Sequence, residues 1–168
     1  MKILAYPKYE SQLRIPGRMV NEDDFKNQDF LQKLDSLKKL SLEDGIGVAA
    51  TQVGWGVKLF ILVVDSNMIE CAPTVYLNPA ILEGCKPEKE VEGCLSFKDL
   101  FLKIERPSRV RWSYTDLSGA EHLQEDKGYF AKAVQHEIDH LNGKLFIDLA
   151  SPVQRKTKVQ AWLKKAAT

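Results

Sequence analysis

The stretch Lys127–Asn142, KGYFAKAVQHEIDHLN, carries the strongest structural pattern in the sequence. One stripe of mostly apolar residues follows the three- and four-residue spacing of an amphipathic helix. The stripe consists of Phe130, Ala133, Val134, Glu137 and Leu141. Gly143 follows directly, where a glycine commonly ends a helix. The pattern therefore predicts a helix over this stretch that ends before Gly143.

A second pattern lies inside this predicted helix, where His136, Glu137 and His140 form H-E-x-x-H. Residues four apart lie on one helical face about one turn apart, so both imidazoles can bind the same metal ion. The intervening Glu137 lies near the same site as a candidate base. The alternative is a helix whose histidines are only solvated or hydrogen-bonded, and this pattern alone leaves that alternative open.

A catalytic metal ion takes three protein ligands and leaves one position open for water, so a third ligand is needed. In common zinc peptidases this ligand is a Glu or a His that follows the motif. Residues 141–168 contain no His, Glu or Cys, and Asp148 is their only carboxylate side chain. This absence weakens a zinc-peptidase interpretation and predicts that the third ligand precedes the helix. The strongest candidates by ligand type are His122, Cys71, Cys85 and Cys94.

Two further stretches combine small residues with chemically active ones. Glu92–Ser96, EGCLS, places Cys94 beside a glycine, so a thiolate could approach a metal ion while backbone N–H groups face a substrate. Gly45–Gln52, GIGVAATQ, permits close backbone approach and ends in an amide that can donate to an oxyanion. The alternatives are a buried structural thiol for Cys94 and a tight loop with a solvated amide for Gly45–Gln52.

The rest of the sequence predicts an α+β fold of mainly antiparallel β-sheets packed around the central HExxH helix, with an N-terminal and a C-terminal helix. Strands are expected at Val57–Val64, Thr74–Asn78, Arg109–Thr115 and Ala120–Gln124, and helices at Asp24–Leu40 and Pro152–Ala166. Pro79 is expected to stop the second strand. The sequence contains no repeats, linkers or low-complexity tracts, so we expect residues 1–168 to form a single domain.

Composition excludes several classes of protein. Lys plus Arg number 24 and Asp plus Glu number 23, so the formal net charge of +1 argues against specific DNA binding and against an anionic membrane as partner. The hydrophobic fraction of 44% and the charged fraction of 28% exclude a disordered or coiled-coil chain. The longest uninterrupted apolar run, Leu59–Val64, falls far short of the ~20 residues that a membrane span needs.

The cysteine count favours a reducing compartment, because three cysteines leave at least one thiol unpaired within the chain. The first residues, MKILAYPK, are not followed by the apolar run of a secretory signal. We therefore expect a cytoplasmic protein, or an organellar one if a transit peptide has been removed.

Three ordered motifs resemble those of the peptide deformylase family: Gly45–Gln52, Glu92–Ser96, and Gln135–Leu141 with Gly143. The resemblance implies a metal ion bound by Cys94, His136 and His140. It further implies that Glu137 is the catalytic acid-base. Gln52 and the backbone N–H of Leu95 match the donors that stabilise the oxyanion.

The resemblance also implies the reaction and its partners. Members of the family are metal-dependent hydrolases that remove the N-formyl group from the N-terminal formylmethionine of nascent polypeptides, releasing formate by attack of a metal-bound hydroxide. The implied substrates are N-formylmethionyl peptides. Fe²⁺ is the cofactor that the resemblance favours, although Zn²⁺, Ni²⁺ or Co²⁺ would also suit a Cys-His-His site in a purified sample.

Four positions match the lining of the family's peptide cleft: Ile46, Gly47, Gly93 and Leu95. Their backbone would hold the substrate as an added strand, which gives affinity without strong sequence demand. Arg106 matches an arginine that supports the second motif, with Glu92 as its expected partner. An ordinary surface arginine is the alternative.

The segment from Ser151 onward is basic and has no acidic side chain; its basic residues are Arg155, Lys156, Lys158, Lys164 and Lys165. A helix with this charge could dock transiently on ribosomal RNA or protein near nascent chains. The solvated face of a terminal helix is the commoner explanation of such a charge pattern.

Overall fold

A curved antiparallel sheet forms the frame of the protein. The computed structural model describes residues 1–43 and 45–166. Within them, five strands pair in the order β1-β2-β3-β4-β5, each antiparallel to its neighbour. Their bounds are Gly47–Ala49 for β1, Leu59–Val64 for β2, Glu70–Glu92 for β3, Leu102–Thr115 for β4 and Glu121–Lys127 for β5.

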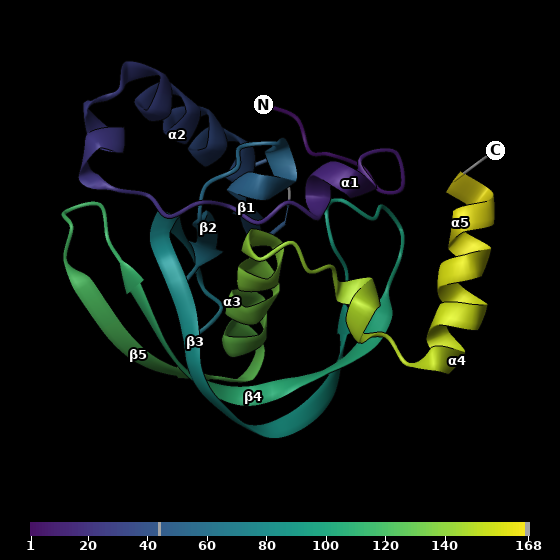
Figure 1. Cartoon of the computed structure of the whole chain (residues 1–168). Helices are drawn as coiled ribbons and strands as arrows, with labels where there is room; N and C mark the ends of the chain where they lie inside the picture. Colours follow the sequence, from purple (N-terminus) through teal and green to yellow (C-terminus); the bar gives the residue numbers. More distant parts are fainter. Residues whose placement is uncertain (44, 167–168) are drawn as a thin grey trace.

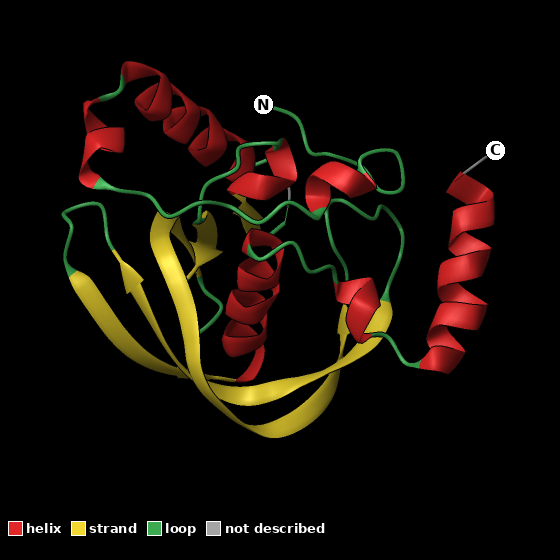
Figure 2. Ribbon diagram, viewed as in Figure 1, coloured by secondary structure: helices red, strands yellow, loops and turns green. Residues whose placement is uncertain are grey.

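The helices lie around this sheet. Their bounds are Glu10–Leu13 for α1, Gln28–Ser41 for α2, Gly128–Leu141 for α3, Pro152–Gln154 for α4 and Gln160–Ala166 for α5. Short 3₁₀ turns span Glu22–Lys26, Ala50–Val53 and Phe146–Leu149, and a π-helical turn, Arg155–Val159, joins α4 to α5. Figure 1 shows α3 in the hollow of the curved β3 and β4, and Figure 2 shows the same view by secondary structure. No helix in the described part of the chain has the length and apolar character needed to cross a membrane.

Strand β2 determines how the two main helices pack, because all of its side chains are buried. Successive side chains of a strand point to opposite faces of the sheet. Leu59 and Ile61 accordingly join the core beneath α2, whereas Phe60 and Leu62 join the core beneath α3. The α2 side of the first core is formed by Phe30, Leu34 and Leu37. The strand expected at Val57–Val64 is thus confirmed as β2, and most of the expected N-terminal helix as α2.

A third core joins both ends of the chain to the loop that follows β3. Phe97 in that loop stacks on Tyr6, with 4.6 Å between the ring centroids, and its centroid lies 5.7 Å from that of Trp162 in α5. The indole N–H of Trp162 donates to the Lys98 carbonyl at 2.7 Å. Val159 is buried in the same core. The expected C-terminal helix is therefore present as α4, the π-helical turn and α5, and it packs on this core through Val159 and Trp162.

Strand β3 is much longer than the sequence predicts. The strand expected at Thr74–Asn78 continues through Pro79 to Glu92, so the expectation that Pro79 stops it is wrong. The pairing of β3 with β4 shifts register across Pro79, and Asn78 has a φ of 49°. Such a bulge accommodates a proline that cannot donate to the ladder. The Asn78 amide also exchanges two hydrogen bonds of 2.8 Å with the Val20 backbone, which fixes the bulge.

The last two strands also extend beyond their predicted bounds. β4 begins at Leu102 instead of Arg109 and pairs with β3 over the added length. Arg106 occupies a buried position in this segment, which hides the apolar alternation that would reveal a strand. β5 extends the expected final strand to Lys127. The described residues form one antiparallel sheet with helices around it, in agreement with the predicted α+β class.

The N-terminal helix begins later than predicted. The segment expected at Asp24–Leu40 is divided, and α2 starts at Gln28. The Asn27 side chain caps α2 by accepting from the Asp29 N–H at 2.9 Å. Asn21 caps the separate 3₁₀ turn before it. Two short polar side chains thus compete for the backbone N–H groups and split one apolar pattern into two elements.

Gly143 ends α3 through its backbone conformation. Its φ is +72°, its N–H donates to the His140 carbonyl at 3.1 Å, and the next N–H donates to the Asp139 carbonyl at 2.9 Å. This is the Schellman arrangement, in which glycine is favoured. A Cβ at this position would also lie against the Arg14 carbonyl.

We expect Gly143→Ala to destabilise the protein more than Gly119→Ala. Both glycines have a positive φ, which costs a side-chain-bearing residue about 1–2 kcal/mol. A Cβ at Gly119 would meet nothing within 4 Å, whereas a Cβ at Gly143 would displace the Arg14 backbone. The added cost should be at least about 1 kcal/mol, as for overpacking in a core. Urea unfolding of both variants measures the difference, and equal free energies of unfolding would contradict this account.

Candidate metal and catalytic site

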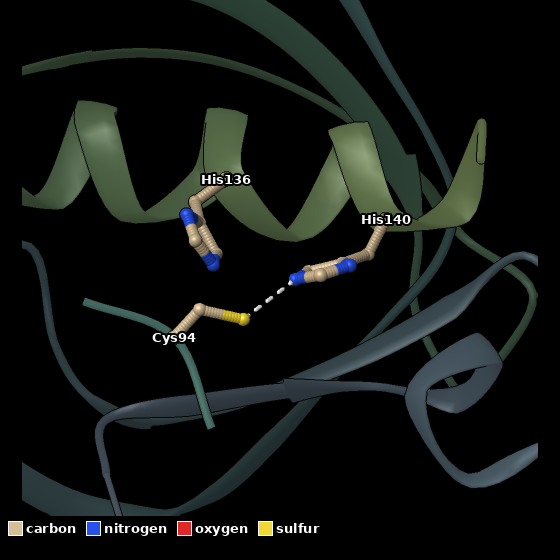
Figure 3. A group of neighbouring side chains, drawn as sticks. All are labelled: Cys94, His136 and His140. Carbon is tan, nitrogen blue, oxygen red and sulfur yellow. Dashed lines mark hydrogen bonds between the residues drawn. The ribbon is translucent and has the colours of Figure 1, made fainter. Parts of the chain in front are cut away.

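Helix α3 and the loop after β3 bring together Cys94, His136 and His140, as Figure 3 shows. The two histidines are four residues apart, so their rings leave the same side of α3. Cys94 faces them from the loop. Its Sγ lies 3.2 Å from His140 Nε2, and the ligand atoms of all three residues lie within 4.8 Å of one another.

This donor set fits one divalent metal ion. At bond lengths of about 2.3 Å to sulfur and about 2.0 Å to nitrogen, tetrahedral ligand atoms lie about 3–4 Å apart. Burial lowers the pKa of His140, which keeps its ring in the neutral form that binds a metal. Burial also opposes protonation of His136, but hydrogen bonds with Cys94 and Glu92 raise the pKa of His136 to about 10. The two rings therefore differ: the neighbours of His136 favour a positive charge there, whereas burial keeps His140 neutral.

The other candidates for the third ligand lie elsewhere. His122 is on β5, and its Nε2 lies 2.6 Å from Asp116 Oδ2. Cys71 and Cys85 are on β3 and belong to no group of potential ligands in the described part of the chain. Of the four candidates, the structure thus places Cys94 beside the two histidines, a choice that residue type alone did not allow.

Glu92, the last residue of β3, orients the His136 ring. His136 Nδ1 lies 3.1 Å from Glu92 Oε2, so a proton on Nδ1 is donated to the carboxylate and Nε2 is left for a metal ion. Arg106 donates two hydrogen bonds to Glu92, at 2.6 and 3.2 Å, and a third to Asp139 at 2.7 Å. Burial raises the pKa of Glu92, but the hydrogen bonds from His136 and Arg106 outweigh it and lower that pKa. The expected pair of Arg106 and Glu92 is present.

Glu137 is a buried carboxyl group at the same site, with 5% of the residue exposed. Burial raises the pKa of Glu137 to about 7, although the positive charges of His136 and Arg106 act to lower it. Its Oε2 finds no hydrogen-bond partner among the described residues. A Cβ placed on Gly47 would lie 3.0 Å from Glu137 Oε1 and 2.5 Å from Leu62, so the carboxyl group needs glycine there. A carboxyl group in this state can take up and release a proton near neutral pH.

The Gln52 side chain is buried and fixed in orientation. Its Oε1 accepts from the Ala49 N–H at 2.9 Å. Its Nε2 consequently faces the other way, 3.6 Å from Cys94 Sγ and 3.3 Å from Ser96 Oγ. The amide therefore presents its donors beside the potential metal ligands, at the edge of the cleft.

A cleft of about 650 Å³ contains this site. Ile46, Gly47, Gly93 and Leu95 line it, together with Gln52 and Glu137. β1 ends the strand order and pairs only with β2 among the described strands, so its other edge is available to an extended peptide. The structure thus brings the sequence-predicted residues to this cleft, except His140, which is buried behind it and contacts Cys94.

Sequence reasoning missed several residues that line the cleft, among them Glu90, Phe101, Tyr129 and Lys132. Lys132 precedes His136 by four residues and therefore shares its side of α3. That spacing is the signal that could have identified it. Tyr129 lies on α3 as well, three residues before Lys132, so the same spacing could have identified it. Glu90 and Phe101 reach the cleft only through the curvature of β3 and the path of the loop, which the sequence does not reveal.

Comparisons with known proteins agree with this geometry. The family model for polypeptide deformylase matches residues 1–156. The peptide deformylase of Rhizobium meliloti (strain 1021) is 39% identical over 136 residues, which cover 80% of this chain and 78% of that protein. A Plasmodium falciparum peptide deformylase solved in complex with an inhibitor has a TM-score of 0.82 and 34% identity, and the match covers 98% of this chain and 97% of that one.

A third comparison is with a class I type b peptide deformylase from Acinetobacter baumannii, solved with Met-Ala-Ser bound. Its TM-score is 0.78 and its identity 29%, over 89% of this chain and 97% of that chain. Sequence and structural relatives thus match most of the chain, and the family model spans the stretch that contains the site. The chain belongs to the polypeptide deformylase family.

Proposed function

We propose that this chain is a metal-dependent hydrolase that removes the formyl group from the N-terminal formylmethionine of nascent polypeptides. The observation that carries the proposal is the Cys94, His136 and His140 cluster beside an unpartnered, buried Glu137 carboxyl group, in a cleft with an open strand edge. Membership of the polypeptide deformylase family supports this reaction over others that a cluster of this kind could catalyse.

The three ligands would hold a divalent ion that supplies Lewis acidity, polarising oxygen atoms placed beside it. Glu137 takes a proton from the attacking water and delivers it to the nitrogen of the departing amine. Water adds to the formyl carbon, the C–N bond breaks, and the products are formate and a peptide with a free amino terminus. A carboxyl group whose pKa burial raises to about 7 suits both proton transfers.

Gln52 and Leu95 are the proposed donors to the formyl oxygen, on which negative charge develops. The bond from the Ala49 N–H to Gln52 Oε1 supports this role, because it turns the Nε2 donors toward Cys94. Preorganised donors of this kind stabilise the transition state more than the ground state. The backbone N–H of Leu95 lies in the loop that carries Cys94, within the same cleft.

The substrate peptide is proposed to lie along β1 as an additional strand. Ile46 and Gly47 line the cleft, and their strand is at the end of the sheet. The Acinetobacter baumannii relative binds Met-Ala-Ser, a peptide that begins with methionine, which supports a substrate of this class. Main-chain pairing would accept many sequences after the first residue.

A zinc-peptidase reaction is the weaker alternative, because the third potential ligand precedes the HExxH helix and comes from a cysteine. Docking of the basic C-terminal segment on the ribosome stays a prediction. Two side chains of this segment already donate hydrogen bonds within the chain: Arg155 donates to the Ala150 carbonyl at 3.0 Å, and Trp162 donates to the Lys98 carbonyl. The free thiols Cys71, Cys85 and Cys94 support the proposed reducing, cytoplasmic setting.

Protein purified without oxygen is expected to release formate from formyl-Met-Ala-Ser and to contain one Fe²⁺ per chain. Exposure to air should cause slow loss of activity, because ferrous iron and the Cys94 thiolate oxidise. Replacement by Ni²⁺ or Co²⁺ should prevent the loss. Formate release and metal content, measured on the same sample, check both points. Full, air-stable activity with Zn²⁺ would exclude iron, and absence of formate with every metal would exclude the proposed reaction.

Glu137→Gln should keep the metal ion and lose at least ~100-fold in kcat, the lower end of general acid–base contributions. The amide has nearly the same shape but cannot accept the water's proton. Glu83→Gln, an exposed glutamate on β3, is the matched control and should retain wild-type kcat. Near-normal turnover by metal-loaded Glu137→Gln would refute the assigned role.

Cys94→Ala should abolish stoichiometric metal binding, because two imidazoles alone make an incomplete site. Cys85→Ala removes an exposed thiol from β3 and should leave one metal ion per chain. Elemental analysis of both purified variants gives the answer. One tightly bound ion in Cys94→Ala would instead favour a ligand set without the cysteine.

A further inference from the structure

The wall of the cleft contains a lysine that the proposed mechanism does not use. Lys132 lies on α3 four residues before His136, and both line the cleft. Its side chain is 4% exposed. An ammonium group is costly to bury unless charged or polar partners compensate it. The partners of Lys132 therefore decide what this wall can bind.

Those partners are two glutamates of β3. Glu88, Glu90 and Glu92 alternate along the strand and share one face. Glu92 contacts His136, and the two preceding glutamates contact Lys132, with distances from Nζ of 3.7 Å to Glu88 and 3.6 Å to Glu90. Both distances exceed that of a hydrogen bond. The carboxylates neutralise the ammonium group, but they do not occupy its N–H donors.

The position of Lys132 on α3 brings it within reach of the first side chain of the proposed substrate. One helical turn advances about 5.4 Å, so Lys132 lies about that far along α3 from His136. A peptide bound with its formyl group at the metal cluster would begin about one helical turn from Lys132, which lines the same cleft as His136. An unbranched side chain such as methionine's is long enough to span that distance.

We propose that Lys132 provides a hydrogen-bond donor at the end of the pocket for the first side chain of the substrate. The enzyme would then accept N-formyl peptides whose first side chain ends in a hydrogen-bond acceptor, methionine sulfoxide included. A wholly apolar pocket rejects such a side chain, because its oxygen would be buried without a partner. The inference rests on the proposed deformylase function and defines the substrate class of that same site.

The alternative is that Lys132 only ties α3 to β3. Glu88 and Glu90 have side chains that are 57% and 52% exposed, so their ion pairs with Lys132 would add little stability. A tie of this kind would not distinguish between substrates. The ratio of kcat/KM values for two side chains of similar shape therefore separates the two roles.

The test uses formyl-X-Ala-Ser peptides in which X is methionine, norleucine or methionine sulfoxide, with formate release as the measurement. The metal-loaded proteins are the wild type, Lys132→Met, Lys132→Arg and Lys89→Met. Lys89 is the matched control. It lies on β3 between Glu88 and Glu90, its side chain is 64% exposed, and it pairs with Glu105 at 3.4 Å.

In the wild type, kcat/KM for the sulfoxide peptide should lie within about tenfold of the value for the norleucine peptide, because the donor compensates the buried oxygen. Lys132→Met should increase the ratio of the norleucine kcat/KM to the sulfoxide kcat/KM, here called the gap, by at least about tenfold. Lys132→Arg, which keeps the donors, and Lys89→Met should both keep the wild-type gap.

A wild-type gap of more than about tenfold, or an unchanged gap in Lys132→Met, overturns the inference. If Lys132→Met does not fold or load metal, the wild-type gap alone decides. Failure of the wild type to cleave any of the three peptides would refute the proposed function itself. Cleavage of the methionine and norleucine peptides with a gap above tenfold would refute only the role of Lys132.

Discussion

The buried guanidinium group of Arg106 connects the sheet to α3, and the geometry of the site depends on this connection. From β4, Arg106 binds Glu92 at the end of β3 and Asp139 on α3. Its side chain is 5% exposed, so removal of either carboxylate would take one of two partners from a buried charge. Glu92 in turn contacts His136. One cation thus fixes the relative positions of the loop that carries Cys94 and the helix that carries both histidines.

Apolar packing also fixes the position of α3 relative to the sheet. β2 is buried on both faces, which fixes α2 on one side and α3 on the other. β3 and β4 extend well beyond β2 and curve beneath α3 (Figure 1), and the end of β3 forms part of one wall of the cleft. The charged residues that β3 gives to that wall, Glu90 and Glu92, share one face because alternate side chains of a strand point the same way.

The sequence predicts elements well where one physical signal dominates. The two-sided burial of β2, the apolar stripe of α3 and the glycine after it all follow from local pattern. Prediction fails where tertiary contacts override local chemistry: β3 passes Pro79 because Asn78 is held by Val20, and Arg106 hides the start of β4. For the site, helical spacing identifies His136 and His140. The Glu92–Ser96 motif and helical spacing likewise point to Cys94 and Lys132, whereas the places of Glu90 and Phe101 in the cleft depend on strand curvature and loop path that no short motif encodes.

The loop after β3 has a consequence for synthesis. Phe97 and Lys98 are held from opposite ends of the chain, by Tyr6 near the start and by Trp162 in the last helix. Lys98 lines the cleft. The rim can therefore reach its final shape only after Trp162 has left the ribosomal tunnel, and a chain still being translated carries an unfinished binding surface.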